Sequence, residues 1–166
     1  MREIAAPALC AAILIAVQVA LAPLPNIELV SLLVILYTLA FGRRVIFIIY
    51  VFALVEGLIF GFQIWWVSYL YVWTILAGIT WLLRTMKHPL GWAILSGAFG
   101  LVFGALCAIP YLIIGGPGMM LSWWLSGIPF DLMHCAGNFV LGLVLWKPLN
   151  GILARLHNNG TSPTDK

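Results

Sequence analysis

Long apolar stretches, separated by short breaks rich in Pro, Gly, Asn or basic residues, run through almost the whole chain. A membrane-spanning helix needs about 20 mostly apolar residues, and such breaks mark its ends. The pattern predicts six transmembrane helices, at Ile4–Ala22, Ile27–Phe41, Val45–Phe62, Trp65–Leu83, Leu90–Gly115 and Met119–Trp146. We therefore expect an all-α integral membrane protein in which residues 1–157 form a single six-helix transmembrane domain and residues 158–166 form a disordered cytoplasmic tail.

The last two predicted spans are longer than a simple crossing requires, and each contains a proline that indicates how it divides. Pro110 is expected to kink the fifth span near its outer end. In the sixth span, residues 126–129 (Ser-Gly-Ile-Pro) are typical of a helix cap followed by proline in the first turn, so the spanning helix is expected to begin near Pro129. Met119–Leu125 would then be an outer lid or an interfacial helix.

The basic residues predict the orientation of the spans. With six spans, all eight Lys and Arg residues fall on one side of the membrane: Arg2, Arg43, Arg44, Arg84, Lys87, Lys147, Arg155 and Lys166. Because short cytoplasmic loops carry the excess of Lys and Arg, this side is expected to be the cytoplasm, and both termini are expected to lie there.

Composition narrows the class of protein further. The chain is 64% hydrophobic and 8% charged, whereas a soluble domain carries about a quarter charged residues, so a separate soluble module is excluded. Scattered basic residues do not form a nucleic-acid patch. Cys10, Cys107 and Cys135 lie in apolar segments without metal-type spacing and are expected to pack. One His and several carboxylates without a tight motif make a poor metal site, and no metal or cofactor is predicted. No phosphate-binding loop motif is present, so ATP-driven transport would need another subunit.

Three carboxylates within or beside the apolar segments are the main candidates for a binding site. A charge in hydrocarbon costs about 2.5 to 3.5 kcal/mol, so such residues mark function by default. Glu28, Glu56 and Asp131 all fall toward the outer face in the predicted topology, and Asp131, His134 and Asn138 are spaced i, i+3 and i+7 on one helical stripe. Alternatively, Asp131 and His134 form a structural pair and Glu28 contacts interfacial water; Glu56 is the acid most expected to contact a ligand.

Other polar and aromatic residues are expected to line the same outer cavity. The polar candidates are Asn26, Gln18, Gln63, Tyr69 and Tyr71, and Trp66, Trp73 and Trp124 are candidates for stacking on a ligand. Because the outer side has no Lys or Arg, the cavity favours a cationic or neutral ligand with hydrogen-bond donors over an anion.

Small residues recur every fourth position on the first predicted span, at Ala8, Ala12, Ala16 and Ala20. Such a ridge lets another helix approach closely. Gly57 with Gly61, and Gly100 with Gly104, repeat the pattern. Each ridge either packs inside the bundle or docks a partner.

From Ile4 to Leu149 the chain resembles the substrate-binding S-components of energy-coupling factor (ECF) vitamin transporters of bacteria. The resemblance is carried by the six predicted spans, the alanine ridge, residues 24–28 (Leu-Pro-Asn-Ile-Glu), and residues 126–131 (Ser-Gly-Ile-Pro-Phe-Asp) followed by His134 and Asn138. It implies a multi-pass protein of the bacterial cytoplasmic membrane that is not an enzyme and that binds a small vitamin-like solute.

The resemblance also implies partners and moving loops. The alanine ridge would dock onto a transmembrane coupling subunit that carries two ATPase subunits, and residues 25–28, 62–66 and 115–127 would close over the solute. Thiamine-like compounds, 7-deazaguanine (queuosine) precursors and cobalamin-related compounds suit an acidic cavity, with a slight preference for deazaguanines because a carboxylate can bind the N–H edge of a guanine-like ring.

Two other classes of function remain open from the sequence. One is an intramembrane enzyme that uses Asp131 and His134 as an acid and base pair. The other is a structural or assembly subunit of the membrane that binds no ligand.

Overall fold

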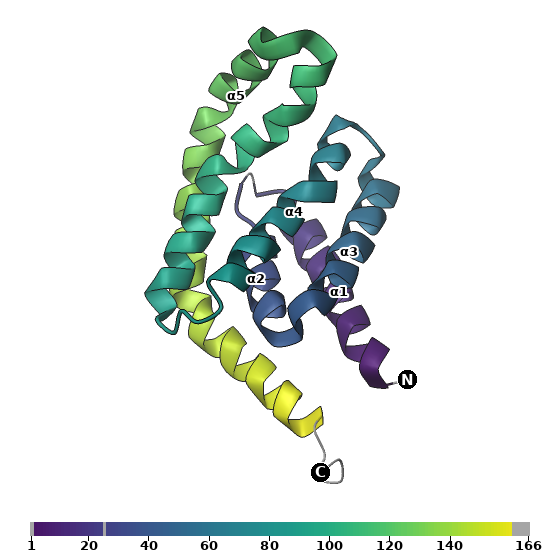
Figure 1. Ribbon diagram of the computed structural model, residues 1–166, viewed down its shortest axis with the longest axis vertical. Coiled ribbons are helices and arrows are strands. Elements are labelled where there is room, and N and C mark those ends of the chain that lie inside the picture. Colours follow the sequence, from purple (N-terminus) through teal and green to yellow (C-terminus); the bar gives the residue numbers. More distant parts are fainter. Residues whose placement is uncertain (1, 25, 161–166) are drawn as a thin grey trace.

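Helices form every regular element in the part of the chain that the computed structural model describes, which is the backbone of residues 2–24 and 26–160 and the side chains of residues 5–24, 26–153 and 155. The elements are α1 (Arg2–Leu21), α2 (Val30–Phe41), a 3-10 turn η1 (Gly42–Arg44), α3 (Val45–Phe60), α4 (Ile64–Leu82) and α5 (Pro89–Gly160) (Figure 1). The predicted all-α fold is therefore confirmed for these residues.

The long element α5 is a hairpin of two helical arms. Gly115 (φ −138°, ψ 15°) and Gly116 (φ 76°, ψ −174°) have non-helical backbone angles and separate a first arm, residues 89–114, from a second arm, residues 117–160. The positive φ of Gly116 is one that glycine adopts without steric cost. The two arms run side by side in opposite directions, and the tip of the hairpin projects beyond the other helices (Figure 1).

The second arm corrects three expectations from the sequence. It is helical through residues 126–129, so the predicted cap at Ser126 is absent and Met119–Leu125 is not a separate helix. Proline's fixed φ is compatible with helical backbone, and the chain reverses instead at the glycine pair, where the φ restriction is weakest. The arm also continues through Gly160, so residues 158–160 are helical; the remainder of the predicted tail, residues 161–166, lies outside the described residues.

Within the described residues, three segments are long and apolar enough to cross a membrane: Val30–Phe60, Ile64–Leu82 and Pro89–Leu153. Ala5–Leu21 is a shorter apolar helix. The second predicted span is shorter than expected, because α2 begins at Val30 and has 12 residues. At 1.5 Å per residue it is about 18 Å long, whereas the hydrocarbon core of a bilayer is about 30 Å thick.

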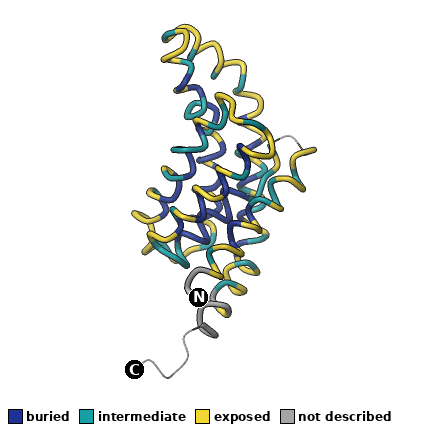
Figure 2. The backbone as a smooth tube through the Cα atoms, turned by 90° about the vertical axis from the view of Figure 1, so that its right-hand side faces the viewer, coloured by how far each residue is buried: buried dark blue, intermediate teal, exposed yellow. Residues whose placement is uncertain are grey.

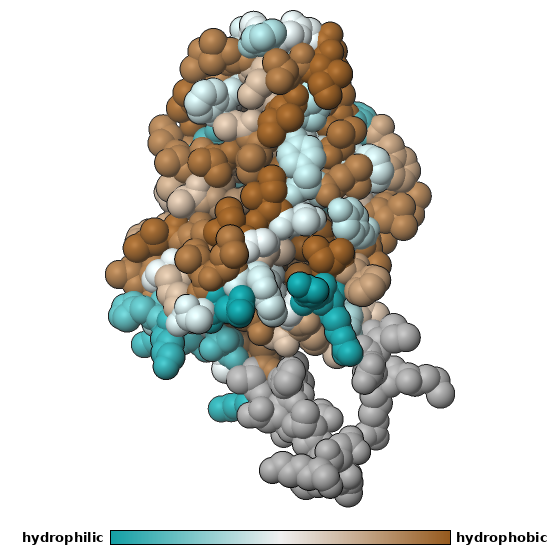
Figure 3. All heavy atoms as spheres, in the orientation of Figure 1, coloured by the Kyte–Doolittle hydropathy of each residue, from teal (hydrophilic) through white to brown (hydrophobic). Residues whose placement is uncertain are grey.

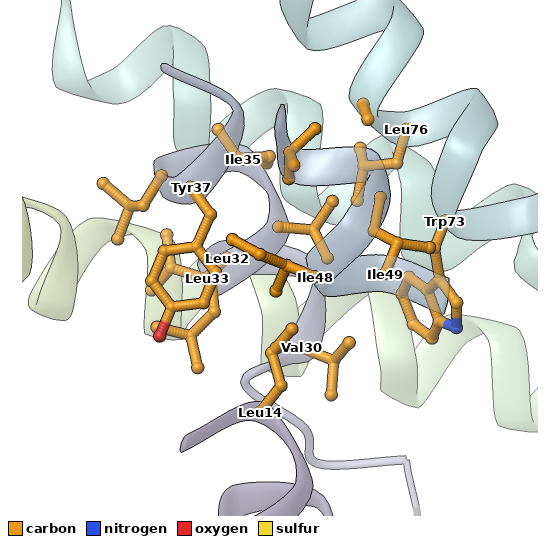
Figure 4. Close-up of a cluster of buried hydrophobic side chains, with 14 of the residues drawn as sticks. Leu14, Val30, Leu32, Leu33, Ile35, Tyr37, Ile48, Ile49, Trp73 and Leu76 are labelled. Atoms are coloured by element: carbon orange, nitrogen blue, oxygen red, sulfur yellow. The ribbon is translucent and has the colours of Figure 1, made fainter. Parts of the chain in front are cut away.

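Helix α2 is the centre of the bundle. Every residue from Val30 to Thr38 is buried, as expected of a helix that is apolar on all sides. Its side chains meet Leu14 of α1, Ile48 and Ile49 of α3, and Trp73 and Leu76 of α4 in one core (Figure 4). Buried backbone accordingly runs through the middle of the molecule, and the hairpin tip is mostly exposed (Figure 2).

The face of the bundle that Figure 3 shows is apolar over most of its height. Large apolar side chains are exposed on α3, α4 and the hairpin, among them Phe47 (72%), Leu82 (77%) and Ile113 (87%). A soluble monomer rarely exposes so much contiguous apolar surface. Lipid is the solvent that suits this surface, which agrees with the membrane-spanning length of the helices.

Glycines allow the two arms of α5 to approach each other closely. A Cβ atom on Gly100 would lie 2.8 Å from the carbonyl carbon of His134, and one on Gly142 would lie 2.8 Å from Cα of Ala93. No real side chain could occupy either position without moving the backbone. The ridge at Gly100 and Gly104 therefore packs inside the protein, where close backbone contact is a main source of helix association in lipid.

Helix α4 compensates for the proline in the first arm. Pro110 has no N–H to donate to the carbonyl of Leu106 four residues earlier. The hydroxyl of Tyr71 donates to that carbonyl at 2.7 Å, and the hydroxyl of Ser68 donates to the carbonyl of Cys107 at 3.5 Å. These contacts join α4 to the first arm just beside the site described below.

Candidate functional site

A cavity of about 180 Å³ lies where the end of α1, residues 22–24 and 26–28, α4 and both arms of α5 meet. Its polar lining residues are Gln18, Asn26, Glu28, Tyr69 and His134. Its aromatic wall is formed by Trp73 and Phe103, and Leu21, Ala22, Leu24 and Ile27 supply the remaining apolar surface. The cavity thus combines a few converging polar groups with an aromatic wall, as small-molecule sites do.

Glu28 and His134 form the central polar pair of the cavity. Nε2 of His134 lies 3.0 Å from Oε1 of Glu28, and their side chains are 5% and 12% exposed, respectively. The second carboxylate oxygen of Glu28 accepts a hydrogen bond from the backbone N–H of Ser31 at 2.8 Å. Because Ser31 lies in the first turn of α2, the helix dipole also favours a negative charge at Glu28.

Opposing effects act on the pKa of Glu28. Burial alone would raise the pKa of this carboxyl group, but the contact with His134 and the hydrogen bonds from Ser31 lower it to below its ordinary value. Glu28 is therefore a carboxylate at neutral pH, and His134 donates its Nε2 proton to it. An ionised acceptor makes this a stronger hydrogen bond than one between neutral groups.

Asn138 lies one helical turn from the pair and holds three elements together. Its side-chain amide donates to Oγ of Ser31 at 3.1 Å and to the carbonyl of Ser96 at 3.4 Å. Asn138 is 1% exposed and is not part of the cavity lining. It therefore ties α2 to both arms of α5 and positions Ser31, which in turn binds Glu28.

Asp131 lies on the same stripe of the second arm but points to the neighbouring arm. Its Oδ1 accepts a hydrogen bond from the backbone N–H of Gly104 at 2.9 Å, and a Cβ atom on Gly104 would collide with the carboxylate. The other oxygen, Oδ2, is buried without a hydrogen-bond partner among the described residues. Asp131 does not line the cavity.

Glu56 on α3 is also placed outside the cavity lining. Its side chain is 1% exposed, and Oε1 has no partner in the described part of the chain. Phe52, one turn before Glu56 on α3, stacks on the ring of Tyr69 at a centroid distance of 5.9 Å, and Tyr69 lines the cavity. Glu56 is therefore a buried acid behind the wall.

Only one of the three candidate tryptophans, Trp73, reaches the cavity. Its ring centroid lies 5.4 Å from that of Tyr69 and 5.5 Å from that of Phe103. Its indole N–H is buried and, among the residues described, has no acceptor. Trp66 instead donates to the carbonyl of Ala53 at 2.8 Å, and Trp124 lies half-buried on the second arm, outside the lining.

Phe103 is the main lining residue that the sequence did not indicate. Its ring centroid lies 4.9 Å from that of His134 in an edge-to-face arrangement. Its position between Gly100 and Gly104 could have predicted this role, because close packing of two helices at those glycines brings the side chain between them next to the opposite arm.

The alanine ridge of α1 faces outward. Ala8, Ala12, Ala16 and Ala20 are all exposed, whereas Cys10, Ala11 and Leu14 on the opposite face are buried. The Gly57 position is different, because a Cβ atom there would collide with the rings of Phe62 and Trp66. The ridge on α1 is thus a smooth face that the other described residues leave uncovered.

No group of three or more His, Cys, Asp or Glu side chains within the described residues is arranged to hold a metal ion. No protein-family model, curated protein or solved structure matches the chain. Function is therefore inferred from the geometry of the cavity and from the sequence.

Proposed function

We propose that the chain is a membrane-embedded substrate-binding protein, of the type of the S-components of ECF transporters, that captures a small cationic or neutral heterocycle. The observation that carries the proposal is the cavity itself, in which the Glu28–His134 pair faces Trp73 inside a bundle with an apolar surface. The two stretches that resemble S-components, residues 24–28 and 126–138, supply Glu28 and His134 to the same pair.

The lining favours a ligand that donates hydrogen bonds. Its hydrogen-bonding groups are the side chains of Glu28, His134 and Tyr69 and the amides of Gln18 and Asn26, and it contains no Lys or Arg. A ligand carboxylate would meet Glu28 without a cationic partner, which disfavours it. An amino group or the N–H edge of a ring would instead satisfy the acid, and Trp73 offers a ring face and an indole N–H that has no acceptor among the described residues.

The size of the cavity narrows the choice among the three compound classes. Its volume of about 180 Å³ is smaller than the roughly 300 to 1,000 Å³ of pockets that hold drug-sized ligands. A single fused ring system suits this space, and a cobalamin-sized compound would require the bundle to open. This supports a 7-deazaguanine or a comparable small heterocycle over a thiamine-like compound.

The proposal includes six crossings of the bacterial cytoplasmic membrane with both termini inside. In support, strongly hydrophilic surface gathers at one end of the molecule (Figure 3), and Arg43 in η1, Arg84 just after α4 and Lys147 on the second arm are exposed. The Glu28–His134 pair would then lie in the half of the protein that faces the outside.

The outward-facing alanine ridge would be the surface that docks onto a transmembrane coupling subunit bound to two ATPases. Because the chain has no nucleotide-binding motif, energy for uptake would come from these partners. Replacing Ala12, an exposed ridge residue, by Leu would then block assembly without changing solute affinity.

Geometry favours binding over acid–base catalysis by Asp131 and His134. Asp131 is bound to the Gly104 N–H and lies outside the cavity lining, while the partner of His134 is Glu28. The two residues of the alternative enzyme hypothesis thus have different partners.

The test is a titration of intrinsic tryptophan fluorescence in the purified, detergent-solubilised chain. Probes would be 7-aminomethyl-7-deazaguanine, thiamine and cobalamin, with biotin and pantothenate as carboxylate-bearing controls. We expect a saturable change with the small heterocycle that is lost in Trp73→Phe and kept in Trp124→Phe. No response to any probe would favour a ligand-free structural subunit, and chemical conversion of a probe would favour an enzyme.

A further inference from the structure

A second hollow lies at the other end of α4, away from the cavity. Tyr69 and Trp73, in the first half of α4, line the cavity, whereas Arg84 follows the last turn of the helix. Here the connection between α4 and α5 meets the end of α2 and the second arm around a space of about 620 Å³. We call it the basic groove; its lining includes Arg84, Thr85, Lys87, Trp92, Trp146 and Asn150.

The basic groove is positively charged, and no acid whose side chain the structure describes lies in its lining. Arg84 and Lys87 are exposed, and none of the three acids with described side chains, which are Glu28, Glu56 and Asp131, lines the groove. A site with two cations and two neutral polar side chains, Thr85 and Asn150, is complementary to an anion that also accepts hydrogen bonds.

Arg84 is held in place at the edge of the groove. Its guanidinium lies 4.4 Å from the centre of the Trp81 ring and donates one hydrogen bond to the carbonyl of Trp81 at 2.9 Å. These contacts use one face and one N–H of a group that has five N–H donors. The guanidinium is thereby oriented while most of its donors stay available to an anion.

The groove also borders strongly apolar surface. Trp92 and Trp146 are buried and stacked at a centroid distance of 5.3 Å, with 13° between their planes. On the neighbouring turns Leu82 and Val144 are 77% and 64% exposed. Figure 3 shows the hydrophilic end of the molecule directly adjoining the apolar surface. An occupant of this boundary would contact cations at one end and hydrocarbon-like surface at the other.

We propose that the basic groove binds the headgroup of an anionic phospholipid. The phosphodiester lies between Arg84 and Lys87, the headgroup hydroxyls contact Thr85 and Asn150, and the acyl chains follow the exposed apolar surface beside Leu82. Basic pockets between transmembrane helices bind lipid headgroups through these same contacts. A soluble phosphate ester shares the contacts with the cations but has nothing to place on the apolar surface. The site does not depend on the solute-binding function proposed above.

The experiment measures lipid binding to the full-length chain in a neutral detergent by native mass spectrometry. Dioleoylphosphatidylglycerol is titrated against the natural chain, against Arg84→Gln/Lys87→Gln, and against Arg43→Gln/Arg155→Gln, which removes two cations outside the groove. We expect the groove variant to bind the lipid roughly tenfold or more weakly, since each basic residue at an anionic surface contributes several-fold to affinity, and the control to stay within about twofold.

Three results would overturn the proposal. They are equal losses in the two double variants, equal affinity for dioleoylphosphatidylcholine, and equal affinity for sn-glycerol 3-phosphate, which would make the ligand a soluble anion. A second readout covers a groove variant that fails to fold. Phosphatidylglycerol with brominated acyl chains should quench the fluorescence of the natural chain more than that of Trp92→Phe/Trp146→Phe, and equal fractional quenching would also contradict the site.

Discussion

His134 and Glu28 lie 3.0 Å apart, Nε2 to Oε1, although 106 positions separate them in the chain. Glu28 lies just before α2, and His134 lies on the second arm of α5. Their contact forms only when the hairpin is packed against the buried central helix. The same packing encloses the cavity, so the pair links the integrity of the fold to ligand binding.

Replacing Glu28 by Gln should weaken binding of the heterocycle by at least tenfold, about 1.4 kcal/mol. The amide keeps the shape of the side chain but removes the charge that His134 and a ligand N–H bind. Isothermal titration of 7-aminomethyl-7-deazaguanine would measure the change. The control for general surface charge is Gln63→Glu, which adds a carboxylate at an exposed position. An unchanged affinity in Glu28→Gln would contradict the role of Glu28 in ligand binding.

The pair should also make stability depend on pH. The pKa of Glu28 in the folded protein is below its ordinary value. The ionised carboxylate therefore stabilises the fold at any pH above the pKa of Glu28 in the unfolded chain. This stabilisation is lost as the pH falls through the lower pKa of the folded protein. Thermal unfolding measured from pH 7 down to pH 3 should therefore show a smaller drop in Tm for Glu28→Gln than for the natural chain. If the Tm of both proteins fell in parallel with pH, the Glu28 carboxylate would not stabilise the fold.

The sequence and the geometry predict different effects of replacing Glu56. If Glu56 contacts the ligand, as the sequence predicts, Glu56→Gln should weaken ligand binding at least tenfold. Its position behind the cavity wall predicts instead that affinity stays within about threefold. Geometry also predicts that Glu56→Met raises Tm, because an apolar side chain of similar size replaces a carboxyl group whose buried Oε1 has no hydrogen-bond partner in the described part of the chain. Titration and thermal unfolding of both variants decide between the two.

Asn138→Ala should destabilise the protein by about 1 to 3 kcal/mol, since Ser31 loses its buried hydrogen-bond partner. Affinity should fall as well, but indirectly, through the loosened position of Ser31 and Glu28. Thermal unfolding with and without the heterocycle separates the effects, because a positioning residue lowers Tm in both conditions. A variant with normal Tm and lost affinity would show that Asn138 contacts the ligand directly.

Gly100→Ala should cost about 1 to 3 kcal/mol, because the added methyl group meets the backbone of His134 at 2.8 Å. The matched control is Gly127→Ala on the second arm, where a Cβ atom has nothing within 4 Å; this change should be neutral or slightly stabilising. Thermal unfolding checks both. Similar Tm values for the two variants would mean that the arms do not pack as described.

Much of the fold could be predicted from the sequence, because the lengths of the apolar segments largely determine where the helices of a membrane protein begin and end. The predicted ends at Phe41, Val45 and Gly115 coincide with, or lie next to, the ends of α2, α3 and the first arm. The error at residues 126–129 arose because a proline that follows Ser and Gly is as compatible with an unbroken helix as with a new one. Local sequence does not distinguish these outcomes when a more permissive glycine pair lies nearby.

The site was harder to predict because helical spacing gives the direction of a side chain but not its partner. The i, i+3, i+7 pattern placed Asp131, His134 and Asn138 on one stripe, and they do lie there. Only His134 turns to the cavity, since a backbone N–H at Gly104 and the hydroxyl of Ser31 lie close enough to bind the other two. Those partners depend on how closely the glycines let the arms approach.

The cavity is proposed to hold a solute through Glu28 and His134. The most direct measurement is mass spectrometry of small molecules that co-purify with the chain from bacterial membranes, compared with Glu28→Gln and with Trp124→Phe, which lies outside the lining. We predict one small heterocycle, without a carboxylate, that is present in the natural chain and in Trp124→Phe and depleted in Glu28→Gln. A solute that is retained equally in all three proteins, or one that carries a carboxylate, would rule out solute binding by the Glu28–His134 pair.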